Sequence, residues 1–232
     1  GGDPRGSNRP AAVCPQGQPG TYSLTGPHLV PLLPEEFAQV ANVSRETLDR
    51  LILFTELLGK WQKSINLVGK QSMPDLWRRH ILDSAQLVPH VPKKVRVITD
   101  LGTGAGFPGL ILALLLDMEI NLVESSGKKI TFLREAARIT GAPVSLYHGR
   151  IEKIRLPKSD LIVARALAPL DKLLGLAAPH LAPGGACLFL KGRAVHEELT
   201  TALKNWKMDV QQFPSATDAS GKIMLIQDIT LV

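Results

Sequence analysis

The spacing of apolar residues predicts that the chain begins its ordered part with helices. Between residues 44 and 61 apolar side chains recur at intervals of three and four, at Leu48, Leu51, Ile52, Leu58 and Trp61. This spacing predicts an amphipathic helix that Ser44 caps. Pro34 followed by two glutamates is typical of an earlier helix start, and a third helix is predicted over residues 73–87. We therefore expect residues 32–92 to form a small helical cap on a larger domain.

From residue 95 onward the pattern alternates between short apolar runs and amphipathic stretches. The runs predict seven strands, at residues 95–100, 119–124, 144–147, 161–164, 186–190, 208–212 and 223–232. Helices are predicted between them, one ending at Leu116 and others at residues 128–140, 170–181 and 195–206. Repeated strand–helix units predict an α/β fold, with a mostly parallel seven-stranded sheet and helices on both faces. The last two strands are expected to be antiparallel, and residues 93–232 to form one domain.

Composition adds limits to this picture. Residues 1–31 contain six Gly and six Pro without an apolar period, so we expect them to be disordered. The longest unbroken apolar run, residues 110–116, is too short to cross a bilayer. Two cysteines, Cys14 and Cys187, supply neither a disulfide framework nor a four-thiolate zinc site. The sequence therefore predicts a cytoplasmic protein without a membrane partner or a bound metal.

The charge balance is basic. The chain has 27 Lys and Arg against 21 Asp and Glu, which gives a net charge of +6. A basic excess fits a polyanionic partner such as nucleic acid, although many enzymes without such a partner are equally basic.

A glycine-rich segment between the first strand of the sheet and the next helix carries the clearest chemical signal. It reads Asp-Leu-Gly-Thr-Gly-Ala-Gly-Phe-Pro-Gly over residues 100–109. Gly104, Gly106 and Gly109 match the G-x-G-x-x-G loop of dinucleotide-binding proteins. Asp100 with Gly102, Gly104 and Gly106 matches the acid-x-G-x-G-x-G loop of S-adenosylmethionine (SAM) methyltransferases. A tight strand-to-helix turn without a ligand is a third interpretation.

The acids near the loop favour SAM. A carboxylate at the strand tip is unfavourable beside a pyrophosphate, whereas Asp100 could help to hold the ammonium group of SAM. Glu124 ends the second strand, where it can accept hydrogen bonds from two ribose hydroxyls, an arrangement that suits NAD and SAM alike. Neither Tyr22 nor Tyr147 is followed four residues later by Lys, so the usual reductase pair is missing. The sequence also has no H-E-x-x-H, paired C-x-x-C or G-x-S-x-G motif.

Several motifs together resemble the RsmG (GidB) family. They are Asn66-Leu67, His-Ile-Leu-Asp-Ser at 80–84, the loop at 102–109, Ser-Gly-Lys-Lys at 126–129, Gly-Arg-Ile-Glu at 149–152, Arg165-Ala166 and Leu-Lys-Gly at 190–192. The resemblance covers residues 44–232, with departures from the family pattern at Ile65 and Val68. It implies a Rossmann-like class I methyltransferase that uses SAM. It further implies methylation of N7 of a guanine in the 530 loop of 16S ribosomal RNA.

The resemblance also implies site residues. The cofactor is expected at Asp100, Gly102, Thr103, Gly104, Gly106, Phe107, Glu124, Ser125, Ser126, Ile151, Glu152 and Arg165. Catalytic roles are expected for Arg165, Arg150 and Asn66. Contacts with the RNA or the small ribosomal subunit are expected from His80, Lys128, Lys129, Lys191 and Arg193. For most of these residues an ordinary structural role is the alternative: an ion pair for Arg165, a helix–helix hydrogen-bond network for His80, and a solvated charge for each lysine.

The residues after the fourth strand agree with a ring nitrogen as methyl acceptor. Enzymes that methylate exocyclic amines often place Asn or Asp, two prolines and an aromatic there, but this chain has Arg-Ala-Leu-Ala-Pro at 165–169. Cytosine-C5 enzymes need a nucleophilic cysteine, and Cys187 lies in an apolar strand. Guanine N7 attacks through a free lone pair, so no general base is required.

We expect a monomeric enzyme; the alternatives are a small-molecule methyltransferase, a non-catalytic RNA-binding module and an NAD-dependent reductase.

Overall fold

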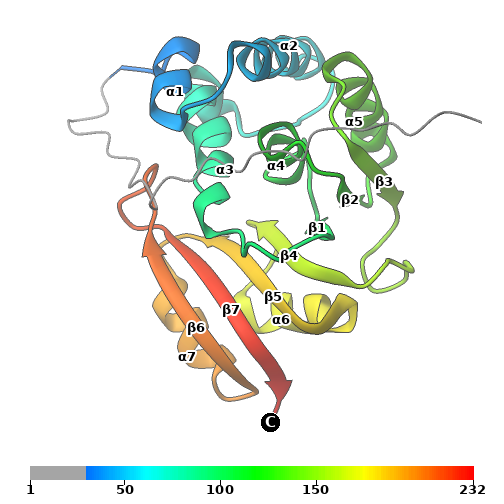
Figure 1. Ribbon diagram of the computed structural model, residues 1–232, viewed down its shortest axis with the longest axis vertical. Coiled ribbons are helices and arrows are strands. Elements are labelled where there is room, and N and C mark those ends of the chain that lie inside the picture. The colour runs from blue at the N-terminus through cyan, green and yellow to red at the C-terminus, as the bar shows by residue number, and fades with distance from the viewer. Residues whose placement is uncertain (1–29) are drawn as a thin grey trace, which may run out of the picture.

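A computed structural model describes residues 30–232 (Figure 1). The prediction of disorder for residues 1–31 falls almost wholly outside this range. The α-helices are α1 (Pro34–Ala41), α2 (Arg45–Trp61), α3 (Asp83–Ala85), α4 (Gly109–Leu116), α5 (Gly127–Thr140), α6 (Leu170–Ala177) and α7 (Val195–Ala202). Shorter helical turns are η1 (Lys70–Asp75), η2 (Trp77–Leu82), η3 (Val88–His90) and η4 (Ala178–His180). The strands are β1 (Ile98–Leu101), β2 (Ile120–Glu124), β3 (Val144–His148), β4 (Ser159–Arg165), β5 (Leu181–Lys191), β6 (Trp206–Pro214) and β7 (Lys222–Leu231).

The seven strands form one sheet in the order β3-β2-β1-β4-β5-β7-β6. The first five strands pair in parallel, and β7 pairs antiparallel with both β5 and β6. This arrangement confirms the predicted mostly parallel sheet and its antiparallel close. The strand order reverses at β1 and β4, and the carboxyl ends of strands beside such a reversal commonly bind ligands.

Helices cover both faces of the sheet (Figure 1). On one face α6 and α7 pack on residues of β4 and β5 such as Ile162 and Phe189. On the other face α4 and α5 pack on the sheet, and the cap helices lie over them. The first six residues of α4 are buried, because the sheet lies on one side of this helix and the cap on the other. That position explains why the segment has no polar stripe.

The cap is held to the sheet domain by aromatic contacts and by a helix-end contact. Phe54 of α2 meets Phe107 and Phe132 at centroid distances of 5.5 and 6.0 Å. Arg50 donates from Nε to the carbonyl of Thr140 at 2.6 Å and from Nη2 to that of Gly141 at 2.7 Å. A cation at the carboxyl end of α5 satisfies carbonyls that lack partners within the helix. The division of the chain between residues 92 and 93 remains a prediction.

Two predicted helix ends are wrong. The helical stretch predicted at 73–87 is confirmed, but it is a succession of η1, η2 and α3, and Pro74 lies inside η1, where it lacks an amide donor. The helix predicted to reach residue 181 ends at Ala177, and a short turn containing Pro179 follows. The last predicted helix ends at Ala202, since Trp206 pairs with Leu231 as the first residue of β6. No helix within residues 30–232 is long and apolar enough to span a membrane.

Candidate functional site

The glycine loop after β1 leaves an open space at one glycine. Gly102, Gly104 and Gly106 have positive φ angles of 68°, 62° and 97°. A Cβ added at Gly102 would lie 2.6 Å from Leu167 Cδ1, so the Leu167 side chain would have to shift to admit it. A Cβ at Gly104 would meet only the carbonyl oxygen of Gly102, at 4.0 Å. Gly104 therefore presents bare backbone to a space that a ligand can fill.

Glu124 joins this loop to the loops that follow β2 and β3. Its Oε2 accepts a hydrogen bond from Gly104 N at 3.0 Å, and its Oε1 accepts one from Ser126 N at 2.8 Å. Its backbone carbonyl accepts one from Gly149 N at 3.1 Å. The structure thus brings the glycine loop, Ser126 and the segment at Gly149 to one end of the sheet. Oε1 also accepts from Ser125 Oγ at 3.5 Å, whereas Oε2 keeps a second lone pair for an external hydroxyl.

Asp100 is buried beneath the loop. Its Oδ2 accepts a hydrogen bond from Gly109 N at 2.8 Å. Burial raises the pKa of Asp100 to about 6, against the opposing effects of the Thr103 hydroxyl, the Gly109 amide and the charge of Arg165. Although Thr103 lies close to the carboxylate, neither its Oγ1 nor Asp100 Oδ1 has a hydrogen bond of good geometry among residues 30–232. Two buried polar atoms beside the loop therefore lack partners, as expected where a polar ligand supplies them.

Three of the residues predicted near the adenine and the reacting atoms, Arg150, Ile151 and Glu152, follow β3 at the end of the sheet where β2 ends in Glu124. Ile151 is buried in a turn where the Arg150 carbonyl accepts hydrogen bonds from Lys153 N and Ile154 N, whereas Arg150 and Glu152 are exposed. Ser125 is exposed beside Glu124. Asn66 is exposed in the connection between α2 and η1.

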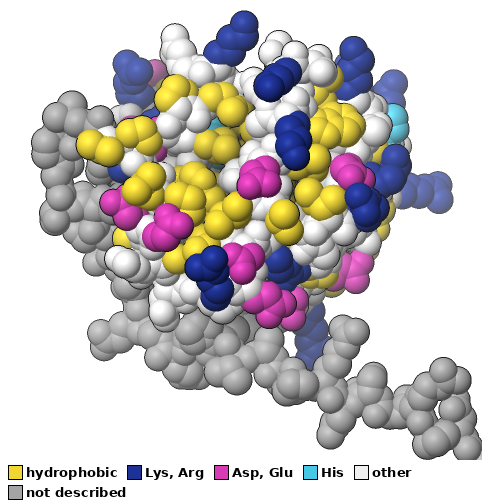
Figure 2. Space-filling model, turned by 90° about the horizontal axis from the view of Figure 1, so that it is seen from above, with side chains coloured by type: hydrophobic (Ala, Val, Ile, Leu, Met, Phe, Trp, Pro, Cys, Tyr) yellow, Lys and Arg dark blue, Asp and Glu magenta, His cyan; other side chains and the backbone are white. Residues whose placement is uncertain are grey.

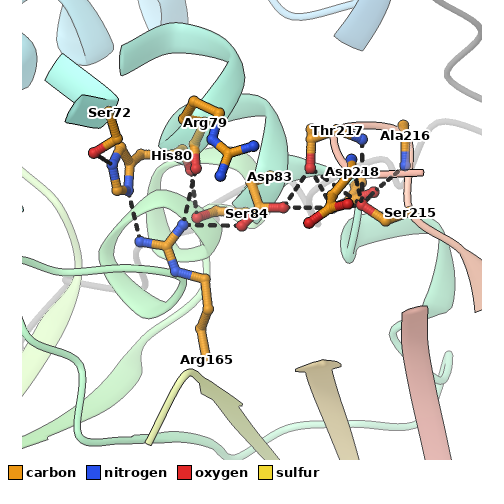
Figure 3. Close-up of polar contacts among 11 residues, drawn as sticks. Ser72, Arg79, His80, Asp83, Ser84, Arg165, Ser215, Ala216, Thr217 and Asp218 are labelled. Atoms are coloured by element: carbon orange, nitrogen blue, oxygen red, sulfur yellow. Dashed lines mark hydrogen bonds and ion pairs between the residues drawn. The ribbon is translucent and has the colours of Figure 1, made fainter. Parts of the chain in front are cut away.

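Arg165, at the end of β4, is joined to the cap. Its Nη1 donates to Asp83 Oδ2 at 2.9 Å and to the carbonyl of Arg79 at 3.2 Å, and its Nη2 donates to His80 Nδ1 at 2.8 Å (Figure 3). Its guanidinium carbon lies 5.0 Å from the centroid of the Phe107 ring. Both terminal nitrogens of Arg165 are thus bonded within the protein, and its side chain separates the glycine loop from the next part of the sheet edge.

His80 lies inside this contact. Its residue exposure is 9 %, and its Nε2 lies 2.7 Å from Ser72 Oγ. Burial, together with the charges of Arg165 and Arg79, lowers the pKa of His80 to about 3, so the ring is neutral near pH 7. Because arginine can only donate, Nδ1 accepts and Nε2 carries the proton. The structure therefore places His80 in a cap-to-sheet hydrogen-bond network, and its predicted contact with RNA has no support from exposure.

The four predicted basic RNA contacts differ in their surroundings. Lys128 and Lys129 occupy the first turn of α5, with Lys128 exposed, and Arg193 is exposed after β5. Lys191 is different, because its side chain is only 7 % exposed and pairs with Glu198. Its Nζ also donates to the carbonyl of Ala168 at 2.8 Å. Lys191 therefore fixes the segment after β4 from within the protein.

A cavity of about 410 Å³ lies on the other side of Arg165 from the glycine loop. It is lined by Arg79, Asp83, Arg165, Ala166, Leu167, Ala168, Pro169, Leu190, Lys191, Gly192, Glu198, Ser215, Thr217, Asp218 and Gly221. Sequence reasoning missed the contribution of the turn between β6 and β7. Asp83 Oδ1 accepts from Thr217 Oγ1 at 2.6 Å and from Gln86 Nε2 at 2.9 Å, so this turn is bonded to the cap (Figure 3). The only feature of the local sequence that could have indicated this contribution was that the turn between the two strands is polar.

Together these features surround two spaces, one at Gly104 of the glycine loop and one in the cavity beside Arg165. The carboxylates at the ends of β1 and β2, the open space at Gly104 and the unpartnered atoms of Asp100 and Thr103 fit the ribose and amino-acid groups of SAM. No cluster of three or more His, Cys, Asp or Glu side chains in residues 30–232 is arranged to hold a metal ion.

Comparisons with known proteins agree with this chemistry. The family model described as rRNA small subunit methyltransferase G matches residues 47–224. A protein of Paramagnetospirillum magneticum named ribosomal RNA small subunit methyltransferase G is 51% identical over 197 residues, which cover 85% of this chain and 96% of that protein. A protein of the same name from Rhodospirillum centenum is 51% identical over 194 residues, covering 84% and 90%.

Solved structures support the fold. A SAM-dependent methyltransferase from Aquifex aeolicus superposes with a TM-score of 0.53 at 15% identity, over 68% of this chain and 94% of that chain. At this identity the likeness shows the fold alone, which is the Rossmann-like fold of class I methyltransferases.

Proposed function

Because the chain belongs to the family of rRNA small subunit methyltransferase G, we propose that it transfers the methyl group of SAM to N7 of a guanine in 16S ribosomal RNA. Membership of the family makes the chain a SAM-dependent rRNA methyltransferase. The acceptor atom, the guanine of the 530 loop and the residue roles described below are parts of the proposal. The observation that carries it is the cavity beside Arg165, here called the acceptor cavity, because the Arg165 side chain lines this cavity and also lies over the Phe107 ring of the glycine loop.

SAM supplies a methyl group that its sulfonium already activates, so the protein mainly has to align donor and acceptor. Gly104 leaves room for the cofactor, and Glu124 accepts hydrogen bonds from its ribose hydroxyls. Asp100 and Thr103 offer polar atoms to its amino-acid end. Ser125, Ser126, Ile151 and Glu152 border the adenine side. Gly102, Gly106 and Phe107 set the conformation of the loop that holds the cofactor. Arg165 acts on the cofactor site indirectly, because its guanidinium packs on the Phe107 ring.

Guanine N7 needs no proton removed before attack, and the acceptor cavity fits that requirement. Its lining contains no histidine, cysteine or tyrosine. Two of its three carboxylates, Asp83 and Glu198, are paired with Arg165 and Lys191, and the third is Asp218. The three cations in its lining, Arg79, Arg165 and Lys191, balance these three carboxylates and keep the cavity close to neutral. That balance suits a product ring that gains a positive charge.

Arg165 acts mainly by position in this proposal. Its bonds to Asp83 and His80 fix the guanidinium between the donor loop and the acceptor cavity. Arg150 and Asn66, which are both exposed, approach the RNA or the methyl donor directly.

The RNA backbone is expected to meet exposed cations around this edge. Lys128 and Lys129 stand at the amino end of α5, where positive charge opposes the helix dipole, so the helix itself gains nothing from them. Arg193 lies beside the acceptor cavity, next to Gly192. Figure 2 shows that on the face above α1, α2 and α5 the Lys and Arg side chains are scattered among apolar and acidic ones. That face carries no concentrated basic surface. We further place the enzyme in the cytoplasm as a monomer.

The proposal is tested by methyl transfer from labelled SAM. Small ribosomal subunits from cells that lack the activity should accept label in their 16S RNA. Subunits from cells that have the activity should accept little, because the target is already methylated. Label that appears in small molecules from a cell extract and not in RNA would favour a small-molecule methyltransferase. SAM binding without transfer to RNA in any form would favour a non-catalytic module.

A further inference from the structure

The acceptor cavity ends at the turn between β6 and β7, and this turn contributes a carboxylate. Ser215, Thr217, Asp218 and Gly221 all line the cavity. The turn is held in place from the cap, because Gln86 Oε1 accepts a hydrogen bond from Ala216 N at 2.7 Å and Asp83 accepts one from Thr217. A side chain on this turn is therefore fixed relative to Arg165 and to the glycine loop.

Three carboxylates line the cavity, and two of them are neutralised. Asp83 is paired with Arg165, and Glu198 is paired with Lys191 and accepts a hydrogen bond from Leu170 N at 2.8 Å. Asp218 differs from both. Its Oδ1 accepts hydrogen bonds from Ser220 N at 2.9 Å and Ser220 Oγ at 2.7 Å, which fix the side chain in the turn. Among residues 30–232 its Oδ2 has neither a hydrogen bond nor an ion-pair partner.

Asp218 is ionised at neutral pH. The hydrogen bonds from Ser220 lower its pKa, and the positive charges of Arg79 and Arg193 add to that effect. An ionised carboxylate can only accept hydrogen bonds. A ligand group facing Oδ2 must therefore be a donor.

The order of strands sets which edge of a bound guanine faces this carboxylate. From the donor loop after β1 the sheet edge passes β4 with Arg165, then β5 with Lys191, and then β7 with the turn. Neighbouring strands are about 4.8 Å apart, so the turn lies on the far side of the cavity from the methyl donor. A guanine whose N7 faces the donor turns its opposite edge, with the N1–H and the N2 amino group, toward the turn. Both of these groups are donors.

We propose that Asp218 is a specificity-determining residue, whose Oδ2 accepts hydrogen bonds from N1–H and the N2 amino group of the acceptor guanine. Enzymes that act on an extruded base commonly read its Watson–Crick edge in this way. Adenine offers an acceptor at N1 and no amino group at C2, so it leaves the carboxylate unpaired and is rejected. This inference rests on the proposed guanine acceptor and adds the group that selects guanine.

The test compares guanosine with inosine, which lacks the N2 amino group, at the target position of reconstituted small subunits. The wild-type enzyme should methylate the inosine substrate with a kcat/KM lower by on the order of 10-fold, the effect of losing one of two paired hydrogen bonds. In Asp218→Asn one oxygen can still accept from Ser220, but the atom that faces the base becomes a donor. This variant should lose 10-fold or more on guanosine, and its guanosine-to-inosine ratio should fall to about one.

Two control variants separate the carboxylate from the turn. Asp209→Asn makes the same charge change at an exposed position of β6, and Ser220→Ala removes a hydroxyl that donates to Asp218. Both should keep the wild-type ratio. A wild-type ratio retained by Asp218→Asn would overturn the inference, as would a ratio of one in Ser220→Ala, which would assign selection to the shape of the turn. Absence of methylation of guanosine by the wild-type enzyme would instead contradict the proposed function itself.

Discussion

Arg165 Nη2 lies 2.8 Å from His80 Nδ1, across 85 positions of sequence, and joins the tip of β4 to the cap. A series of hydrogen bonds extends from this contact into the cap. His80 Nε2 donates to Ser72 Oγ, and Ser72 Oγ donates to the carbonyl of Gly69 at 2.8 Å. The His80 ring also lies 4.9 Å from the ring of Phe107. His80 therefore connects the cap to the glycine loop and, through Arg165, to the acceptor cavity.

This network makes stability depend on pH in a defined direction. His80 gains a proton below about 6.5 in the unfolded chain, but only below about 3 in the folded protein, so acid favours unfolding. Replacing His80 by Gln should lower the free energy of unfolding by about 1–3 kcal/mol at pH 7.5. The wild type should then lose about 1.4 kcal/mol more than the variant between pH 7.5 and pH 5.5. Urea unfolding at both pH values measures this difference, and the exposed His196→Gln is the control. Equal pH dependence of wild type and His80→Gln would contradict it.

Gly104 is expected to be required for the cofactor and not for the fold. Valine there should weaken SAM binding by about 2 kcal/mol or more, because its side chain enters the space beside bare backbone. Gly184→Val is a matched control, since Gly184 also has a positive φ, of 73°, and an added Cβ there likewise meets no side chain within 4 Å. Calorimetry should show loss of SAM affinity in Gly104→Val alone, while both variants lose similar stability. Unchanged SAM affinity in a folded Gly104→Val protein would contradict the donor site.

Asp100 should make SAM binding sensitive to mild acid. Burial raises its pKa to about 6, and a bound ammonium favours its charged form. SAM affinity should therefore fall about 10-fold between pH 7.5 and pH 5 as the carboxylate gains a proton. In Asp100→Asn the affinity should be lower at pH 7.5 and flat over this range. Asp117→Asn, an exposed change on the connection before β2, should behave as the wild type. An unaltered pH dependence in Asp100→Asn would remove this residue from the cofactor site.

Arg165 should matter more for the reaction than for the cofactor. Arg165→Ala breaks the bonds to Asp83 and His80 and should reduce kcat/KM by 10–1000-fold, about 1.4–4 kcal/mol, with SAM affinity nearly unchanged. Arg165→Lys should recover only part of the rate, because an ammonium cannot serve both partners as the planar fork does. Thermal unfolding of each variant separates lost rate from lost structure. The pH profile of single-turnover methylation should show no essential base that titrates near neutrality.

RNA binding should depend steeply on salt. The affinity should fall by about 0.7 log units per log unit of salt for each single-strand phosphate contact. Replacing both Lys128 and Lys129 by Gln should reduce that slope, whereas SAM affinity should stay constant. Lys191→Gln should instead lower stability, since its ammonium is paired with Glu198 inside the protein. An RNA affinity that is flat between low and physiological salt would contradict phosphate contacts at this edge.

The local pattern of the sequence predicted the strands and the glycine loop, but not the partners of its polar residues. Apolar runs identify β1, β2 and β4 because burial on both faces of these strands leaves a continuous apolar signal. Lys191 carries the same charge as Arg193, yet one is internal and the other exposed, and no local feature distinguishes them. The contact of Arg165 with His80 depends on how the cap docks, and the place of Asp218 depends on how the last hairpin closes on the cavity. Both are tertiary relationships that periodicity does not contain.

The most direct test of the account is the position of the methyl group in the RNA. Small subunits that lack the modification are incubated with the protein and SAM, and the 16S RNA is then reduced and treated with aniline, which cleaves at N7-methylguanine. We predict one new cleavage, at a guanine of the 530 loop, that depends on both enzyme and SAM. A methyl group on an exocyclic amine, a ribose oxygen or cytosine C5 would contradict it, even with SAM binding intact.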